Sequence, residues 1–284
     1  MSQIKAIIIG LSLAAIMSGA FALGKKTFVW SDINTREVIR WDGDSAVVRQ
    51  GSSMQELTCN ITIDQSKVTE AIESFGIPKT WTTFMYTDER DLAKQQKELK
   101  AKAANYGIKM LEESNRFTID YNWVINQNKS SIEEIAKRIR STARRRGYRS
   151  RRELVGAFAS FVQSLKYRVP RDYRLNGKNE KILTAGAMMP LETLAIGWGD
   201  CDSKSMLFAA LVQSIDLVDV CFIVMDEHLF AAVQLSPKAE DHSVRYKGED
   251  WVLIELTDAW PIGRVPEKHL HNIKNRRYTI VDLN

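Results

Sequence analysis

The chain has 284 residues, of which 44% are hydrophobic and 26% are charged, and it carries a formal net charge of +5. This length is enough for one large domain or two modest ones, and the composition is that of an ordinary globular protein with a sizeable core. It therefore excludes a mainly disordered chain, and no internal repeat or low-complexity linker is present.

Residues 1–22 predict a signal peptide. Lys5 is followed by an apolar run, and the run ends at residues 20–22 in Ala-Phe-Ala, a small-residue cleavage site. An uncleaved membrane anchor is the alternative, because about 18 apolar residues can span a bilayer. The cleavage site favours removal, so we expect a mature protein that begins at Leu23 in the periplasm or outside the cell. No second apolar run of that length follows, so we expect the mature chain to be soluble.

Residues 23–130 predict a small α+β module. Short strands are expected between residues 27 and 64, including a hairpin that turns at Asp42-Gly43 and a strand from Leu57 to Ile63. A short helix from residue 68 to 75 and a long charged helix over residues 88–106 follow. Residues 117–125 alternate as in a strand. No residue pattern in this module indicates chemistry of its own.

Residues 131–284 begin with a predicted helix, because Ser131 and Glu134 match a capping box. The helix leads into an arginine segment, Arg144–Arg152, in which six of nine residues are arginine. A solvated helix junction explains this segment, since cations are favourable at a helix C-terminus. The alternative is docking on an anionic cell-envelope polymer. Nucleic acid is not an expected partner, because no recognition motif is present.

The most informative segment runs from residue 197 to 205 and reads Gly-Trp-Gly-Asp-Cys-Asp-Ser-Lys-Ser. Apolar residues after Cys201 recur at helical spacing, which predicts a helix of about three to four turns with one buried stripe. Asp200 is a suitable N-cap, so Cys201 lies in the first turn, where the helix dipole favours a thiolate. Backbone N–H groups of that turn can hold an oxyanion. We interpret Cys201 as a nucleophile, whereas Cys221 in a predicted strand is a small buried hydrophobic residue.

Downstream strands offer a base and an acid for this nucleophile. Residues 220–225 predict a buried strand, a turn follows at residues 226–227, and His228 begins the returning strand. A third strand is predicted from Trp251 to Thr257, and Glu255 interrupts its apolar run. A carboxylate without a partner is costly there, and a histidine on the neighbouring strand is a suitable partner. The other three histidines lie in polar, charged segments.

This order of cysteine, histidine and acid resembles that of the transglutaminase-like branch of the papain-type cysteine enzymes. The resemblance covers roughly residues 150–266. It rests on residues 190–194 and 199–205 for the nucleophile segment, Glu227-His228-Leu-Phe for the histidine strand, and Glu255-Leu-Thr followed by Trp-Pro-Ile-Gly at 260–263 for the acid strand. Residues 161–167 resemble the helix that precedes the nucleophile in that family.

The resemblance implies catalytic roles for Cys201, His228 and Glu255. Many relatives carry aspartate as the acid, so the glutamate is a departure, and Asp258 is the rival candidate for the third position. Trp198 and Gln163 could shape the oxyanion site or the acyl-donor groove, although packing also explains both. No Cys/His cluster has ligand spacing, so we expect no metal and no cofactor.

The expected fold is α+β. A papain/transglutaminase-like core over residues 131–284 has its nucleophile helix packed on an antiparallel sheet, and the small module of residues 23–130 precedes it. The expected function is acyl chemistry on amide or peptide bonds of a protein or peptide substrate, through a Cys201 thioester. The alternative is a non-catalytic binding or scaffold protein of the same fold at the cell envelope. The sequence leaves open the substrate, the oligomeric state, and whether water or an amine accepts the acyl group.

Overall fold

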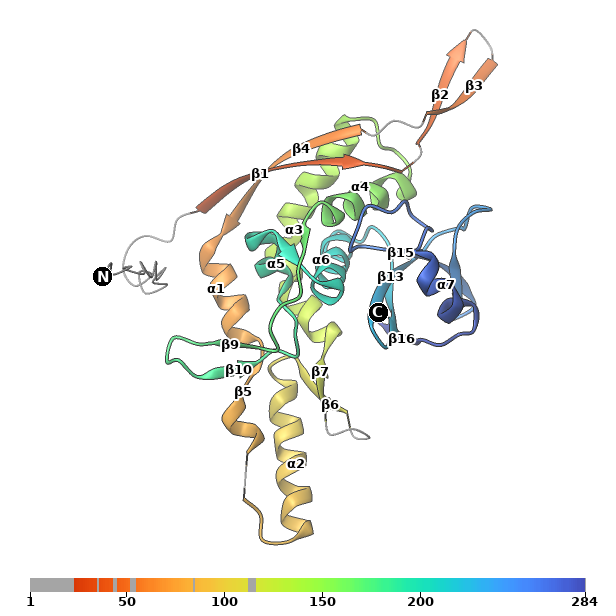
Figure 1. Cartoon of the computed structure of the whole chain (residues 1–284). Helices are drawn as coiled ribbons and strands as arrows, with labels where there is room; N and C mark the ends of the chain where they lie inside the picture. Colours follow the sequence, from red (N-terminus) through yellow and green to blue (C-terminus); the bar gives the residue numbers. More distant parts are fainter. Residues whose placement is uncertain are drawn as a thin grey trace, which may run out of the picture.

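The computed structural model describes residues 23–34, 36–42, 45–51, 55–83, 85–111 and 116–283. Over these residues the protein is a mixed α+β structure, in which a five-stranded antiparallel sheet lies beside a group of helices (Figure 1). The predicted signal peptide, residues 1–22, lies outside the described residues and stays a prediction. In the described part of the chain, no helix is long and apolar enough to cross a membrane.

A long β-ribbon begins the described chain and continues into a hairpin that extends away from the helices (Figure 1). Its strands are β1 (Leu23–Asp32), β2 (Arg36–Asp42), β3 (Ser45–Gly51) and β4 (Gln55–Asp64). The predicted strand pairing of the hairpin and the predicted strand from Leu57 to Ile63 are confirmed, whereas Gly43 of the predicted turn lies outside the described residues. Trp30 of β1 and Leu57 of β4 are buried, so the ribbon belongs to the hydrophobic core of the protein.

The next segment holds three helices, a 3-10 turn and three short strands. They are α1 (Gln65–Ser74), β5 (Ile77–Pro78), η1 (Lys79–Thr82), α2 (Glu89–Ala104), β6 (Ile108–Leu111), β7 (Arg116–Ile119) and α3 (Tyr121–Arg145). The two helices predicted in this segment are confirmed. The strand predicted over residues 117–125 is wrong beyond Ile119, because the Asp120 carboxylate caps a helix by accepting from the backbone N–H of Trp123 at 3.1 Å.

The helix predicted to start at Ser131 in fact starts ten residues earlier in the chain, at Tyr121. The capping box predicted at Ser131 is therefore wrong, and the structure has one at Ser150 and Glu153 instead. A domain boundary at residue 131 would cut a continuous helix. The division of the chain into two modules stays a prediction.

The remaining elements comprise the five-stranded sheet, the helices around it and four short strands outside it, β8 to β11. They are α4 (Arg151–Gln163), β8 (Lys166–Tyr167), β9 (Tyr173–Leu175), β10 (Lys181–Leu183), α5 (Pro190–Ile196), β11 (Trp198–Gly199), α6 (Cys201–Gln213), β12 (Val220–Met225), β13 (His228–Gln234), β14 (Ser243–Tyr246), β15 (Glu249–Ile254), α7 (Glu267–Lys274) and β16 (Thr279–Asp282).

The sheet has the strand order β14-β15-β13-β12-β16, and every neighbouring pair is antiparallel. The predicted turn between β12 and β13 is confirmed, with Met225 opposite His228. Because side chains alternate along a strand, Phe222 and Leu229 join the main core while Cys221 and Phe230 join a second cluster on the other face. α7 covers that second face with its residue Ile273.

Helix α6 lies at the centre of the protein, in contact with α3, α4 and α5 and with strands β12 and β13 (Figure 1). Residues 203–212 are all buried. The sequence predicted only one buried stripe for this helix, and that prediction is wrong. A helix that is buried all round belongs to the core of a protein, so its first residue is held firmly in position.

Candidate functional site

Cys201 is the first residue of α6, as its capping predicts. The Asp200 carboxylate accepts from the backbone N–H of Ser203 at 2.9 Å, and the Asp200 carbonyl accepts from the backbone N–H of Lys204 at 3.0 Å. The predicted N-cap is therefore confirmed. A Cβ atom at Gly199 would lie 3.0 Å from the Ser203 Cβ, so the close approach of loop and helix favours glycine there.

The loop that carries the cysteine is held by a short parallel strand pair between β8 and β11. The backbone N–H groups of Lys166 and Arg168 donate to the carbonyls of Gly197 and Gly199 at 3.1 and 3.0 Å. The guanidinium of Arg168 lies 4.7 Å from the centre of the Trp198 ring, which is a cation–π contact. Trp198 thus packs within this strand pair, and its suggested part in an oxyanion site stays a prediction.

His228 and Glu255 form a buried pair. The distance between His228 Nε2 and Glu255 Oε2 is 2.7 Å, and the side chains are 10% and 1% exposed. Burial raises the pKa of Glu255, but hydrogen bonds from His228 and from Thr257 outweigh it and hold that pKa below its usual value. Glu255 is therefore ionised at neutral pH. Its carboxylate requires the hydrogen on Nε2, which leaves Nδ1 of His228 as a proton acceptor.

Glu255 follows β15 directly, whereas the sequence predicted that the strand runs on to Thr257. The second carboxylate oxygen of Glu255 accepts from the backbone N–H and the hydroxyl of Thr257 at 2.7 and 2.6 Å, which turns the chain out of the sheet. Asp258 is exposed and accepts from the backbone N–H of Ala259 at 2.8 Å. The acid in contact with His228 is thus Glu255.

Gln163, at the end of α4, holds residues 255–265, which we name the acid loop. Its side-chain nitrogen donates to the carbonyls of Glu255 and Trp260, both at 2.8 Å. Both amide hydrogens are therefore engaged, so this arrangement does not offer Gln163 as an oxyanion donor. Its contribution is to fix the position of the acid.

Lys204 is fully buried one turn after Cys201, and the sequence analysis missed it. Its ammonium group donates to the carbonyls of Gln163, Leu165 and Thr257 at 3.3, 2.9 and 3.4 Å. Burial lowers the pKa of Lys204 to about 8. The lysine joins α6 to α4 and to the acid loop, and a lysine in an apolar helical run gives no local signal of such partners.

The sulfur of Cys201 lies at the start of β13. The backbone N–H of Leu229, the residue after His228, lowers the pKa of the thiol, and the thiol donates to Asp202 Oδ2 at 3.4 Å. Burial, followed by the carboxylates of Asp202 and Asp200, raises the pKa of the Cys201 thiol. The predicted resting thiolate is therefore wrong. Desolvation and two nearby negative charges outweigh a helix dipole worth about 0.3–1 kcal/mol.

Cys201 and the two aspartates beside it form a group of potential metal ligands, but both aspartates already have hydrogen-bond partners. One ligand atom each of Asp200, Cys201 and Asp202 lies within 4.8 Å of the others, the one such group in the described part of the chain. Asp200 accepts from Ser203 at 2.9 Å, and Asp202 accepts from the Tyr121 hydroxyl at 2.5 Å. We assign no metal to these residues, and the expected absence of metal and cofactor stays a prediction.

His269 of α7 is the site residue that the sequence analysis left in a charged segment without a role. Its ring stacks on that of His228, with centroids 4.4 Å apart and planes 16° apart. Pro266 before the helix, with Leu270 and Ile273 at helical spacing, could have indicated an amphipathic helix there. No local pattern could have indicated which ring it covers.

A pocket of about 930 Å³ opens beside His228. Its walls come from the segment after α4, the acid loop and α7, with Tyr167, Asp258 and Lys268 among the lining residues. Burial raises the pKa of Tyr167, whose ring is half-exposed in this pocket. The pocket has the size of a small-molecule or peptide site.

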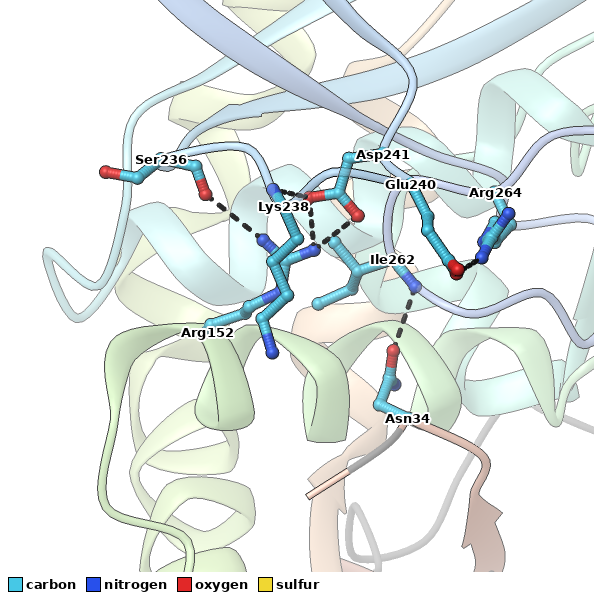
Figure 2. A network of polar contacts seen from close by, with 8 residues as sticks. All are labelled: Asn34, Arg152, Ser236, Lys238, Glu240, Asp241, Ile262 and Arg264. Carbon is cyan, nitrogen blue, oxygen red and sulfur yellow. Dashed lines mark hydrogen bonds and ion pairs between the residues drawn. The ribbon is translucent and has the colours of Figure 1, made fainter. Parts of the chain in front are cut away.

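A polar network outside the site secures the acid loop, and Figure 2 shows it. Arg152 of α4 donates to both carboxylate oxygens of Asp241 at 2.7 and 2.6 Å and to the carbonyl of Ser236 at 3.3 Å. The side chain of Asn34, between β1 and β2, accepts from the backbone N–H of Ile262 at 2.8 Å (Figure 2). Asn34 thus anchors the chain that follows Glu255, while Arg152 joins α4 to the segment between β13 and β14.

Arg152 is therefore occupied in an ion pair, and the rest of the arginine segment lies at the junction of α3 and α4. Arg149 donates to the carbonyl of Arg144 at 3.0 Å, as expected for a cation at a helix C-terminus. The side chains of Arg144, Arg149 and Arg151 are exposed. Docking of this segment on an anionic polymer stays a prediction.

No protein-family model matches the sequence, and no curated protein is similar enough to it to count as a match. The functional assignment therefore rests on the residues and distances described above.

Proposed function

We propose that the protein is an exported cysteine enzyme of the transglutaminase-like type, which acts on amide or peptide bonds through a thioester on Cys201. The observation that carries the proposal is the buried 2.7 Å contact between His228 and Glu255, at the end of a strand that contacts the helix of Cys201 and whose Leu229 N–H lowers the pKa of that thiol. An ionised carboxylate that orients a histidine beside a thiol is the arrangement that activates a cysteine nucleophile.

In the proposed reaction, Nδ1 of His228 takes the thiol proton as the Cys201 sulfur attacks the carbonyl carbon of an amide. The C–N bond breaks when His228 returns this proton to the leaving amine, which leaves a thioester on Cys201. Water or a second amine then attacks the thioester with His228 as base. The product is an acid or a new amide, and the thiol is restored.

The raised pKa of the thiol decides the order of these events. Because burial and two carboxylates favour the protonated form of Cys201, the sulfur loses its proton during the attack rather than before it. The negative charge of Glu255 stabilises the imidazolium that His228 becomes. The positive end of the α6 dipole lies where the oxyanion would form.

A chromogenic acyl donor tests the proposal without knowledge of the substrate. We expect p-nitrophenyl acetate to acetylate Cys201, seen by peptide mass mapping, with release of nitrophenol. Cys201→Ala should abolish the adduct, and His228→Gln should slow its formation by about 10²–10⁴-fold. Glu255→Gln should have a smaller effect, and Asp258→Asn, which changes an exposed carboxylate of the same pocket, should have none.

The second candidate is a non-catalytic binding or scaffold protein that docks through its exposed arginines. The raised pKa of Cys201 favours it, because a resting thiol is a weak nucleophile. Acetylation that is equally fast in wild type and in His228→Gln would refute the enzyme and leave this candidate. Export to the periplasm or the outside has its own test, since N-terminal sequencing of the native protein should begin at Leu23.

A further inference from the structure

Two aromatic rings pack against the His228 side chain next to its contact with Glu255. His269 stacks on one face at 4.4 Å and 16°, and Phe230 meets the His228 ring edge-on at 4.5 Å and 76°. Phe230 also meets His269 edge-on, at 5.3 Å and 89°. The base is therefore packed by rings from both β13 and α7.

His269 is carried by a helix that is held by apolar packing further along its length. Ile273, one turn further along α7, is buried against the outer face of the sheet, together with Val265 before the helix. His269 Nε2 is buried and has no hydrogen-bond partner among the residues that the structure describes. The ring thus meets its surroundings through its face rather than through that nitrogen.

We propose that His269 is a positioning residue, which acts on the reaction through His228. The last torsion of a histidine side chain is broad and close to two-fold, so an imidazole without packing can rotate out of line. Stacking by His269 fixes the ring plane, so that Nε2 of His228 faces Glu255 and Nδ1 is presented for proton transfer. The stacked ring also keeps water from the buried hydrogen bond between His228 and Glu255. The part of this inference that concerns Cys201 rests on the proposed function.

His269 suits this position because it remains neutral. Burial, followed by the charge on His228, lowers the pKa of His269. Lys268 acts in the same direction, and Glu255 opposes them. His228 can therefore become cationic during the reaction without a second cation stacked on its face.

Three variants of the full chain separate ring packing from other roles. His269→Ala removes the stacked ring, and His269→Phe keeps a flat ring without ring nitrogens. His271→Ala is the matched control, since this exposed histidine of the same helix contacts only Asn275 among the contacts described. Thermal melting of each variant verifies that it is folded.

Two measurements report on the inference. The first is the proton resonance of the His228 Nε2–H in isotope-labelled protein, assigned by its loss in His228→Gln. We expect His269→Ala to exchange this proton with water at least about tenfold faster, because the covering ring is gone. The second is alkylation of Cys201 by iodoacetamide, which we expect to be about tenfold slower in His269→Ala, since small misplacements of a catalytic group are costly. His269→Phe and His271→Ala should match wild type in both.

The outcomes separate this inference from the proposed function. Unchanged proton exchange in a folded His269→Ala variant would overturn the positioning role, and so would a His269→Phe variant as impaired as His269→Ala. If proton exchange responds as expected but alkylation of Cys201 is insensitive to His228→Gln, the stacking role stands and the enzymatic proposal fails.

Discussion

Asp200→Asn gives a stability prediction that can be worked from the structure. Burial raises the pKa of Asp200 to about 6 from an ordinary 3.8. Each pKa unit corresponds to about 1.4 kcal/mol, so the ionised carboxylate costs the folded state up to about 3 kcal/mol. Asparagine caps a helix as well as aspartate and keeps the acceptor for the Ser203 N–H.

The sign of the pH dependence follows from the raised pKa. Well below pH 3.8 Asp200 is protonated in both folded and unfolded chains and costs nothing, whereas above pH 6 it is ionised in both and the full cost is present. Wild type should therefore lose stability from this group as the pH rises from about 4 to about 6. A charged N-cap gains about 0.3–1 kcal/mol from the helix dipole, which leaves a net advantage of about 2 kcal/mol for Asp200→Asn at pH 7.

Urea unfolding at pH 4 and pH 7 measures this difference. We expect Asp200→Asn to exceed wild type by about 2 kcal/mol at pH 7 and by less than about 1 kcal/mol at pH 4. Asp258→Asn is the control, because removal of an exposed carboxylate should change stability by less than about 0.5 kcal/mol at either pH. An advantage of Asp200→Asn that is the same at both pH values would refute the reasoning.

Three further predictions follow from the contacts of the site. Asp202→Asn removes the carboxylate that raises the pKa of Cys201 more than Asp200 does. Iodoacetamide alkylation of Cys201 at pH 7 should therefore become about threefold faster for each unit by which that pKa falls. No acceleration would contradict the assignment of this effect to Asp202. Gln163→Leu breaks both hydrogen bonds to the acid loop and should cost about 2–3 kcal/mol in urea unfolding. Arg152→Ala leaves a carboxylate of 5% side-chain exposure without its bidentate partner and should cost about 2–4 kcal/mol, whereas the exposed neighbour Arg151→Ala should cost less than about 0.5 kcal/mol.

Local features of the site could be predicted from the order of residues along the chain. The N-cap Asp200, the helix that begins at Cys201, and the turn between β12 and the strand that begins at His228 were all predicted correctly. Each depends on residues within one or two turns, or on the alternation of one hairpin, so the chain pattern carries the information. A prediction was wrong where two local patterns overlapped. At Asp120, a helix N-cap of α3 lies inside a stretch whose alternation predicted a strand.

The way in which these local features contact one another depends on the packing of elements that are distant in the chain. The contact of His228 with Glu255 joins residues 27 positions apart, and the stacking of His269 on His228 brings a helix from the end of the chain onto the same strand. The raised pKa of Cys201 is likewise a property of its surroundings, because desolvation depends on everything packed around the thiol. Local periodicity fixes which face of an element is apolar, but it does not say which neighbour covers that face.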